Sequence, residues 1–264
     1  MSIYYKERPE YLILSLNSVL EQTIPPSEVI IVEDGPLTDE LYRVLDEFSK
    51  KYPNIKRLPL SENHGLGVAL NIGVSACNHE LIARMDTDDI SLPNRFEKQL
   101  EFMKDNPNID ICGTWLTEFI DTRDNLCRMR KVPITDTEIK KYICQRPPFS
   151  HPTVMYKKSK VLKAGNYQHF DKLEDWWLWA RMMNTGALMA NIPESLLLFR
   201  TNKETYKRRG GLKFAMNIVR LQKQLYQMHI SNKMDVLKCI FIRFTVALIP
   251  NWARNILYTK VFRS

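Results

Sequence analysis

Apolar and amphipathic stretches alternate along residues 1–120 of the chain. Four short apolar runs have the length and composition of buried β-strands: residues 28–32, 55–60, 81–85 and 109–119. Four longer segments carry apolar residues at helical spacing: residues 9–22, 38–51, 65–76 and 93–106. Regular alternation of strand and helix is typical of a mostly parallel sheet with helices on both faces. We therefore predict an α/β fold, with residues 1–5 as a short additional strand.

The regular alternation fades after residue 121. A proline-rich turn precedes a predicted strand at 153–156, and a helical pattern follows at 174–184. Two further helices are predicted at 214–229 and 234–248, the second of them basic and amphipathic. These patterns predict a main domain over residues 1–205, made of a regular half 1–120 and a less regular half 121–205, followed by a helical extension over residues 206–264.

The positive charge of the chain is concentrated in its last part. The 264 residues carry a formal net charge of +8, and 44% of them are apolar, which is enough for a sizeable core. Residues 203–264 contain 13 basic and 2 acidic side chains (net +11), whereas residues 1–202 contain 25 basic and 28 acidic ones (net −3). Such an extension suits an anionic membrane leaflet, a nucleic acid or a phosphorylated substrate. Arg200, Arg208 and Arg209 can neutralise a diphosphate, or they can form a solvated basic loop.

The sequence also indicates a cellular compartment. It contains no recognisable signal peptide and no uninterrupted apolar segment long enough to cross a bilayer. Its five cysteines are odd in number and include no Cys-x-x-Cys pair, which favours a reducing compartment over a disulfide or zinc scaffold. We therefore expect a cytoplasmic protein.

A run of acidic residues follows the predicted strand at 81–85. Asp86 and Asp88 stand one residue apart at a strand end, where ligands of open α/β sheets bind. Two such carboxylates can hold a divalent cation, which in turn holds a diphosphate. Acidic triplets also occur in ordinary turns, because Asp accepts backbone hydrogen bonds there. Asp88 is the better metal ligand, Asp89 suits a turn cap, and Arg84 can touch a base or brace the loop.

Two more segments have the chemistry of a nucleotide site. Asp34 ends a predicted strand, where its carboxylate can accept a hydrogen bond from the N–H of a uracil-type base. Asn63 and Gly65 precede a predicted helix, whose N-terminus favours anions and whose glycine permits close backbone approach. Plain turns explain both segments as well, and no P-loop lysine follows.

Candidate acceptor-side residues come from the second half of the chain. Glu174 and Asp175 begin a predicted helix beside Trp176 and Trp177. A positioned carboxylate can remove the proton of an attacking sugar hydroxyl, and the aromatic rings can form a sugar platform. The helix dipole alone also favours acids at this position. His151 lies in a rigid proline-rich turn. The sequence allows it either to take part in the site or to have a purely structural role.

In their order along the chain, these motifs resemble a family 2 glycosyltransferase with the A-type nucleotide-sugar fold. The resemblance extends over residues 1–210 and rests on five segments: Tyr4-Tyr5, Glu33-Asp34-Gly35, Asn63-x-Gly65-Leu66-Gly67, Asp86-Thr87-Asp88 and Glu174-Asp175. Two further segments are similar to bacterial members that build O-antigen, capsule or exopolysaccharide, the amylovoran-type branch: Ser150 to Met155 and Arg208-Arg209-Gly210. The chain departs from the family at its start, where the residues that usually precede the first strand are nearly absent.

The resemblance implies a role for each part of the chain. Residues 1–205 would be the nucleotide-sugar-binding and catalytic domain, with a donor half 1–120 and an acceptor half 121–205. Asp34 would bind the base, while Asp86 and Asp88 would hold Mn²⁺ or Mg²⁺. Asp175 would be the catalytic base, with Glu174 beside it as the alternative. The implied nucleotide-sugar-binding residues are Tyr4, Tyr5, Glu7, Asp34, Asn63, Gly65, Arg84, Asp86, Thr87 and Asp88. The implied acceptor and diphosphate residues are His151, Trp176, Trp177, Arg208 and Arg209.

The activity implied by the resemblance is that of an inverting hexosyltransferase in bacterial surface polysaccharide synthesis. A hexose, with galactose favoured, would move from a UDP-sugar to an undecaprenyl-diphosphate-linked saccharide. The protein would lie at the inner face of the cell membrane, held there by its basic extension, and would bind no nucleic acid. One alternative is a nucleotidyltransferase acting on a sugar phosphate, although its usual glycine-rich phosphate loop is missing. The other is a non-catalytic binder of anionic lipid or nucleic acid, which would not need Asp86, Asp88 and Asp175 together.

Overall fold

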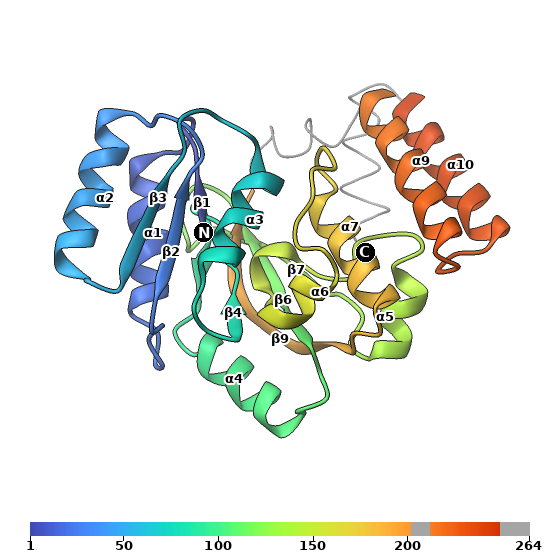
Figure 1. Cartoon of the computed structure of the whole chain (residues 1–264), viewed down its shortest axis with the longest axis horizontal. Coiled ribbons are helices and arrows are strands. Elements are labelled where there is room, and N and C mark those ends of the chain that lie inside the picture. Colours follow the sequence, from blue (N-terminus) through green and yellow to red (C-terminus); the bar gives the residue numbers. More distant parts are fainter. Residues whose placement is uncertain (202–211, 249–264) are drawn as a thin grey trace.

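The computed structural model describes residues 1–201 and 212–248 (Figure 1). Its first part alternates strand and helix: β1 (Ser2–Ile3), α1 (Pro9–Leu20), β2 (Val29–Glu33), α2 (Asp39–Lys51), β3 (Ile55–Pro59) and α3 (Leu66–Ala76). The three strands form a parallel sheet in the order β1-β2-β3. This part agrees closely with the predicted strands and helices.

Strand β2 shows why helices cover both faces of this sheet. All five of its residues are buried. Val29 and Ile31 pack in a core cluster with α1 and α2, whereas Ile30 and Val32 pack against α3. A strand that is buried on both faces needs a continuous apolar run rather than an alternating one, and β2 has such a run.

The second part of the fold is built around a six-stranded mixed sheet. Its elements are β4 (Leu81–Ala83), β5 (Ile90–Ser91), α4 (Arg95–Asp105), β6 (Ile111–Phe119), β7 (Leu126–Arg130), α5 (Asp136–Tyr142), the 3₁₀ turn η1 (His151–Thr153), β8 (Met155–Lys157), α6 (Lys158–Lys163), α7 (Glu174–Asn184) and β9 (Met189–Arg200). The strand order is β4-β8-β6-β9-β5, with β7 added alongside β6.

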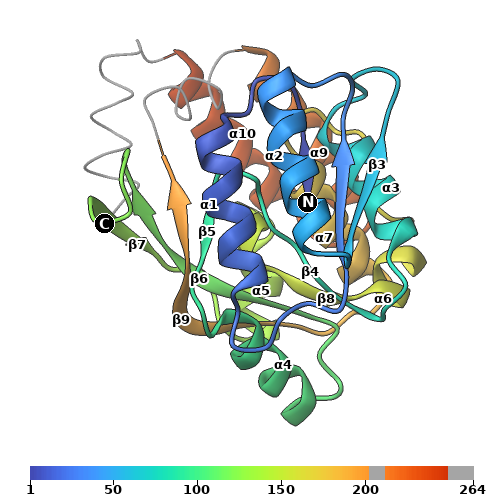
Figure 2. The same ribbon diagram turned by 90° about the vertical axis from the view of Figure 1, so that its left-hand side faces the viewer.

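The pairing in this second sheet differs from the mostly parallel arrangement that we predicted. Only β6 and β9 pair in parallel, while the other four pairs are antiparallel. Short connections explain the difference, because a parallel pair needs a long crossover whereas an antiparallel pair can be joined by a short loop, as β6 and β7 are. The α/β class itself is confirmed. Figure 1 shows α1 and α2 at the left of the molecule and α5 and α7 at the right, and in Figure 2 α1 and α2 lie in front of α7.

The described part of the predicted C-terminal extension is a helical hairpin of α9 (Leu212–Gln227) and α10 (Lys233–Leu248). Its apolar residues join the core cluster that contains Trp176 and Trp179 of α7. Gln222 of α9 also donates through Nε2 to the carbonyl oxygen of Cys144, at 3.0 Å. No helix within residues 1–201 and 212–248 is both long and apolar enough to cross a membrane. Arg208 and Arg209 lie outside the described residues.

Candidate active site

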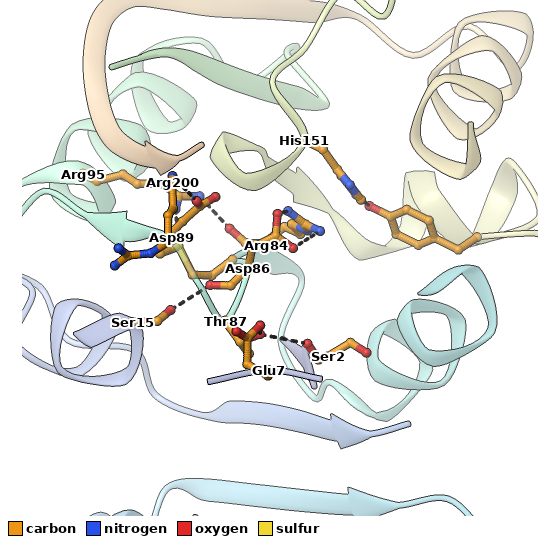
Figure 3. Close-up of polar contacts among 12 residues, drawn as sticks. Ser2, Glu7, Ser15, Arg84, Asp86, Thr87, Asp89, Arg95, His151 and Arg200 are labelled. Atoms are coloured by element: carbon orange, nitrogen blue, oxygen red, sulfur yellow. Dashed lines mark hydrogen bonds and ion pairs between the residues drawn. The ribbon is translucent and has the colours of Figure 1, made fainter. Parts of the chain in front are cut away.

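Three carboxylates converge in the segment that joins β4 to β5. Because these two strands lie at opposite ends of the second sheet, the chain crosses the whole sheet between residues 84 and 89. Oxygen atoms of Asp86, Asp88 and Asp89 lie within 4.8 Å of one another along this crossing. The crossing also contacts α1 and the first sheet: Ser15 of α1 donates to the carbonyl oxygen of Asp86 at 2.7 Å, and the hydroxyl of Thr87 donates to the carbonyl oxygen of Ser2 in β1 at 3.5 Å. The predicted Asp-x-Asp motif therefore stands where the two sheets meet (Figure 3).

Arg84 fixes the orientation of Asp86. Its Nη1 donates to Oδ2 of Asp86 and its Nη2 pairs with Oδ1, so that both carboxylate oxygens are engaged by one guanidinium group. Arg84 is only 4% exposed, whereas the Asp86 side chain is 30% exposed. A planar guanidinium holds a carboxylate in one plane. Arg84 therefore braces the loop, which is one of the two roles that we predicted for it.

Asp88 and Asp89 occupy an environment that disfavours their charged forms. Burial, followed by the nearby carboxylates of Asp86 and Glu7, raises the pKa of Asp88 to about 7. Burial, followed by Asp88 and Asp86, raises the pKa of Asp89 well above its ordinary value. Oδ2 of Asp89 is buried without a hydrogen-bond partner among the described residues. An excess of buried negative charge and an unpartnered carboxylate oxygen fit a divalent cation, whose preferred ligands are oxygens of this kind.

Arg200, at the end of β9, supports the acidic segment from the other side. Its backbone N–H donates to Oδ1 of Asp89 at 2.8 Å, and its Nε donates to the carbonyl oxygen of Asp88 at 2.9 Å. Its guanidinium group lies 3.7 Å from the ring centre of Tyr11 and 4.5 Å from that of Phe119. Arg200 is 6% exposed, so it is a buried brace rather than part of a solvated basic loop.

Asp34 organises the loop that leads into α3. Its Oδ1 accepts from the backbone N–H of His64 at 2.8 Å, and its Oδ2 accepts from Gly65 N and Asn63 Nδ2, both at 3.0 Å. The next residue, Gly35, has φ +86°, and a Cβ atom there would lie 2.7 Å from the backbone nitrogen of Asn63. The two predicted nucleotide segments are thus brought together, and base binding by Asp34 remains a prediction.

The segment after β1, residues 4–7, lies next to the acidic segment. Glu7 accepts through Oε2 from the hydroxyl of Thr87 at 2.8 Å, which joins the start of the chain to the acidic segment. The rings of Tyr4 and Tyr5 meet edge to face at 5.9 Å, and Tyr5 is 51% exposed. The structure therefore brings Glu7 and Thr87 together next to the acidic cluster. Tyr5, two residues before Glu7 in the sequence, has an exposed ring.

Glu174 and Asp175 begin α7, which meets the start of α3. A Cβ atom at Gly67 would lie 2.9 Å from Cγ of Glu174, so the two helix starts are in contact. Glu174 is 8% exposed, and its Oε1 accepts from the backbone N–H of Lys172 at 3.2 Å. Burial, offset in part by hydrogen bonding and reinforced by Asp175, raises the pKa of Glu174. Asp175 is more exposed than Glu174.

One predicted acceptor residue is corrected by the structure. Trp176 is 1% exposed and donates through Nε1 to the carbonyl oxygen of Ile143 at 2.8 Å, so it belongs to the core and cannot serve as a sugar platform. Its neighbour Trp177 is half-buried, and its Nε1 donates to Oε1 of Gln168 at 3.0 Å. Successive helical residues face different directions, which is why two adjacent tryptophans have different surroundings.

His151 lies on the second half of the fold, in the turn η1. Its Nε2 lies 2.9 Å from the hydroxyl oxygen of Tyr167, and its ring also contacts Trp179. Figure 3 shows the position of His151 relative to Arg84 and Asp86. Burial, followed by the Arg84 guanidinium, lowers the pKa of His151 well below its ordinary value. The imidazole is therefore neutral at pH 7, and its contact with Tyr167 was not predicted from the sequence.

Two contributors to the cluster were missed or underestimated by the sequence reasoning. Asp89 was interpreted as a turn cap, yet its carboxylate belongs to the cluster with Asp86 and Asp88. For Arg200 the sequence left open a diphosphate ligand and a solvated basic loop, whereas the structure shows that it braces the backbone of the acidic segment. The run of three acids in four residues was the available signal for Asp89, whereas no local signal joins Asp89 to a residue 111 positions away.

Comparisons with known proteins agree with this geometry. The family model for Glycosyl transferase family 2 matches residues 2–165. Over 263 residues the chain is 39% identical to an Escherichia coli UDP-Gal:alpha-D-GlcNAc-diphosphoundecaprenol beta-1,3-galactosyltransferase, covering 100% of this chain and 95% of that one. It is 35% identical, with the same coverage, to the amylovoran biosynthesis glycosyltransferase AmsE of Erwinia amylovora.

Solved structures show the same fold at low identity. The mannosyltransferase PcManGT of Pyrobaculum calidifontis, in complex with GDP-Man and Mn²⁺, has a TM-score of 0.63 at 14% identity, covering 98% of this chain and 72% of that one. S. aureus TarS 1–349 in complex with UDP-GlcNAc has a TM-score of 0.59 at 16% identity, covering 83% of this chain and 66% of that one. The predicted resemblance is confirmed by the family match and by the full-length relatives. This chain belongs to glycosyl transferase family 2.

Proposed function

We propose that this chain is a metal-dependent, inverting galactosyltransferase. Its donor would be UDP-galactose, and its acceptor a saccharide carried on undecaprenyl diphosphate in bacterial surface polysaccharide synthesis. The observation that carries the proposal is the convergence of Asp86, Asp88 and Asp89 at the sheet junction. The choice of donor and acceptor is supported by the 39% identity, over the full chain, to a relative whose name specifies both.

The acidic cluster is the proposed site of the metal ion. Asp88 and Asp86 would hold Mn²⁺ or Mg²⁺, and the unpartnered Oδ2 makes Asp89 a third candidate ligand. When bound, a divalent cation screens the charge of the diphosphate and helps UDP to leave. Arg84 keeps the Asp86 carboxylate in place for this task, and Arg200 keeps the backbone of Asp88 in place.

Asp175 is the proposed catalytic base. It would accept the proton of the acceptor hydroxyl as that oxygen attacks the anomeric carbon from the face opposite UDP. One displacement inverts this carbon, which agrees with a β-linked product from an α-linked donor. Asp175 is favoured over Glu174 because Glu174 is the more buried of the two.

The remaining residues are assigned to binding. Asp34 would accept from the uracil base and hold Asn63 and Gly65 in the loop beside it, with Tyr4, Tyr5, Glu7, Arg84 and Thr87 completing the nucleotide side. On the acceptor side, Trp177 would offer its half-buried ring, and His151 would act as a neutral hydrogen-bonding group. Arg208 and Arg209 remain predicted diphosphate ligands.

The proposed location is the cytoplasmic face of the cell membrane. An undecaprenyl-linked acceptor is embedded in the bilayer, so the enzyme must work at its surface. The net charge of +11 in residues 203–264 supports attraction to an anionic leaflet. No nucleic acid partner is proposed.

The test is UDP release from a panel of UDP-sugars with a synthetic acceptor that carries a sugar-diphosphate-lipid group. We expect turnover of UDP-galactose with Mn²⁺ and loss of turnover with EDTA. Asp88→Asn and Asp175→Asn should each lower turnover by at least about 10²-fold. Asp124→Asn is the matched control, because the Asp124 side chain is 91% exposed. Full turnover in EDTA would contradict the metal, and turnover of another UDP-sugar alone would contradict galactose.

A further inference from the structure

Helix α10 exposes an apolar stripe that is framed by lysines. Met234, Leu237 and Phe241 are 59%, 61% and 72% exposed, and their spacing of three and four residues places them on one face. Lys233 and Lys238 are also exposed, and helical geometry places them on either side of this stripe. The α10 face is defined here by these five residues and the 45%-exposed Ile242 next to them.

The opposite side of α10 attaches the helix to the protein. Cys239 is 3% exposed and belongs to the core cluster that includes Trp176 and Trp179. The exposed side of the partner helix α9 is more basic: Lys213, Arg220 and Lys223 are exposed there, around a single exposed methionine, Met216, at 61%. The row of exposed apolar residues at helical spacing thus lies on α10, on the side opposite the buried Cys239.

We propose that the α10 face rests on an anionic lipid leaflet, with α10 parallel to the membrane plane. Single exposed apolar residues are ordinary, but a row of them flanked by basic residues is the pattern of an interfacial helix. The lysines favour anionic lipid over a second copy of this chain, because a symmetric pairing of the same face would bring like charges together. The inference deepens the proposed function, and it rests on that function for the lipid-linked acceptor.

The hairpin is tied to the acceptor side of the site. Lys213 Nζ pairs with Oδ2 of Asp171 at 3.0 Å, and Asn217 Nδ2 donates to the carbonyl oxygen of Asp171 at 3.3 Å. Asp171 stands three residues before Glu174, near the end of the loop that leads from α6 into α7. Helices α7, α9 and α10 lie together on the same side of the molecule (Figure 1). Docking of α10 on the leaflet would therefore hold the loop that precedes Glu174 and Asp175 at a fixed place relative to the lipid-linked acceptor.

The experiment is flotation of the full chain with vesicles of phosphatidylcholine, alone or mixed with phosphatidylglycerol. We expect the protein to float with the anionic vesicles only, and less so at high salt. Leu237→Glu should weaken binding by at least about tenfold, because it replaces a membrane-buried leucine with a charge. Leu14→Glu is the matched control, since Leu14 is 44% exposed on α1, on the far side of the molecule from α10 (Figure 1). Thermal unfolding of each variant confirms that it is folded.

Four results would overturn the inference: no flotation of the parent, equal flotation with both vesicle types, unchanged flotation of Leu237→Glu, and an equal loss in Leu14→Glu. Light scattering tests the alternative occupant, a second copy of the chain. If the parent is a dimer and Leu237→Glu is a monomer, the α10 face is a contact between copies and the inference is wrong.

Activity separates this inference from the proposed function. Leu237→Glu should keep turnover of a short-chain acceptor in solution and lose about tenfold with the acceptor embedded in anionic vesicles. Flotation without turnover of any UDP-sugar would contradict the function and leave the lipid surface standing. Turnover without flotation would contradict the lipid surface and leave the proposed function standing.

Discussion

Arg95 is completely buried, and its Nη2 donates to the backbone carbonyl oxygen of Arg84 at 2.8 Å. Its Nε donates to Oε1 of Gln99 at 2.9 Å, and Gln99 donates through Nε2 to the carbonyl oxygen of Thr153 at 2.9 Å. Arg95 and Gln99 are one turn apart on α4, so this helix joins the strand end before the acidic cluster to the turn η1. A single buried network therefore connects the donor half to the acceptor half.

Replacing Arg95 by methionine should lower the free energy of unfolding by about 3 kcal/mol, because the carbonyl of Arg84 and the amide of Gln99 lose a buried donor. Urea denaturation measures the change. Arg43→Met on α2 is the control, since the Arg43 side chain is 70% exposed in a surface pair with Glu40 and should change stability by less than about 1 kcal/mol. Similar losses in the two variants would argue against a special role for the Arg95 network.

Asp89→Asn tests whether Asp89 is a metal ligand or only a support for Arg200. Asparagine keeps an Oδ1 acceptor for the backbone N–H of Arg200 and removes the charge from the unpartnered Oδ2. We expect Mn²⁺ to raise the unfolding temperature of the parent, and its affinity for the variant to fall by at least about tenfold. Asp124→Asn should respond like the parent. An unchanged Mn²⁺ response in Asp89→Asn would restrict Asp89 to its contact with Arg200.

Gly67→Ala should impair catalysis more than donor binding. The added Cβ would lie 2.9 Å from Cγ of Glu174 and 3.1 Å from the carbonyl oxygen of Gln168, so the loop before α7 must move. Small displacements of catalytic groups are costly, and kcat should fall at least about tenfold while KM for UDP-galactose changes less. Gly73→Ala on the same helix meets only a side-chain atom of Val32 at 3.2 Å and serves as control. Equal kcat values in both variants would show that this contact does not position Glu174 and Asp175.

The fold could be predicted where its signals are local. β2 is a continuous apolar run, and α2 begins after Thr38, whose hydroxyl accepts from Leu41 N and caps the helix. Strand β9 was missed although it has 12 residues, because Pro193 interrupts it and its pairing with β6 shifts register near Ser195. Its role as a central strand depends on pairing with residues far away in the sequence.

The candidate site, too, could be predicted from the sequence only where the signal is local. Asp86 and Asp88 could be selected because their spacing and their place after a strand are visible in the sequence. The burial of Trp176 could not, since α7 packs between distant elements and its Nε1 finds a partner 33 residues away. Long-range partners decided which predicted residues face the site and which belong to the core.

The last prediction concerns pH and His151. Its pKa is lowered well below 6.5 in the folded protein by burial and by Arg84, so below pH 6.5 the unfolded chain binds a proton that the folded protein does not. Stability should therefore fall as the pH drops below 6.5, by at most about 1.4 kcal/mol per pH unit from this group. Asp88 acts in the opposite direction, because a pKa raised to about 7 favours the folded protein as the pH falls through that value. The raised pKa of Asp89 acts in the same direction as that of Asp88. The difference between the parent and His151→Gln in urea denaturation from pH 5 to 8 isolates the histidine, and exposed His64→Gln is its control. A parent and a His151→Gln variant with parallel pH profiles would mean that His151 takes up its proton equally in both states.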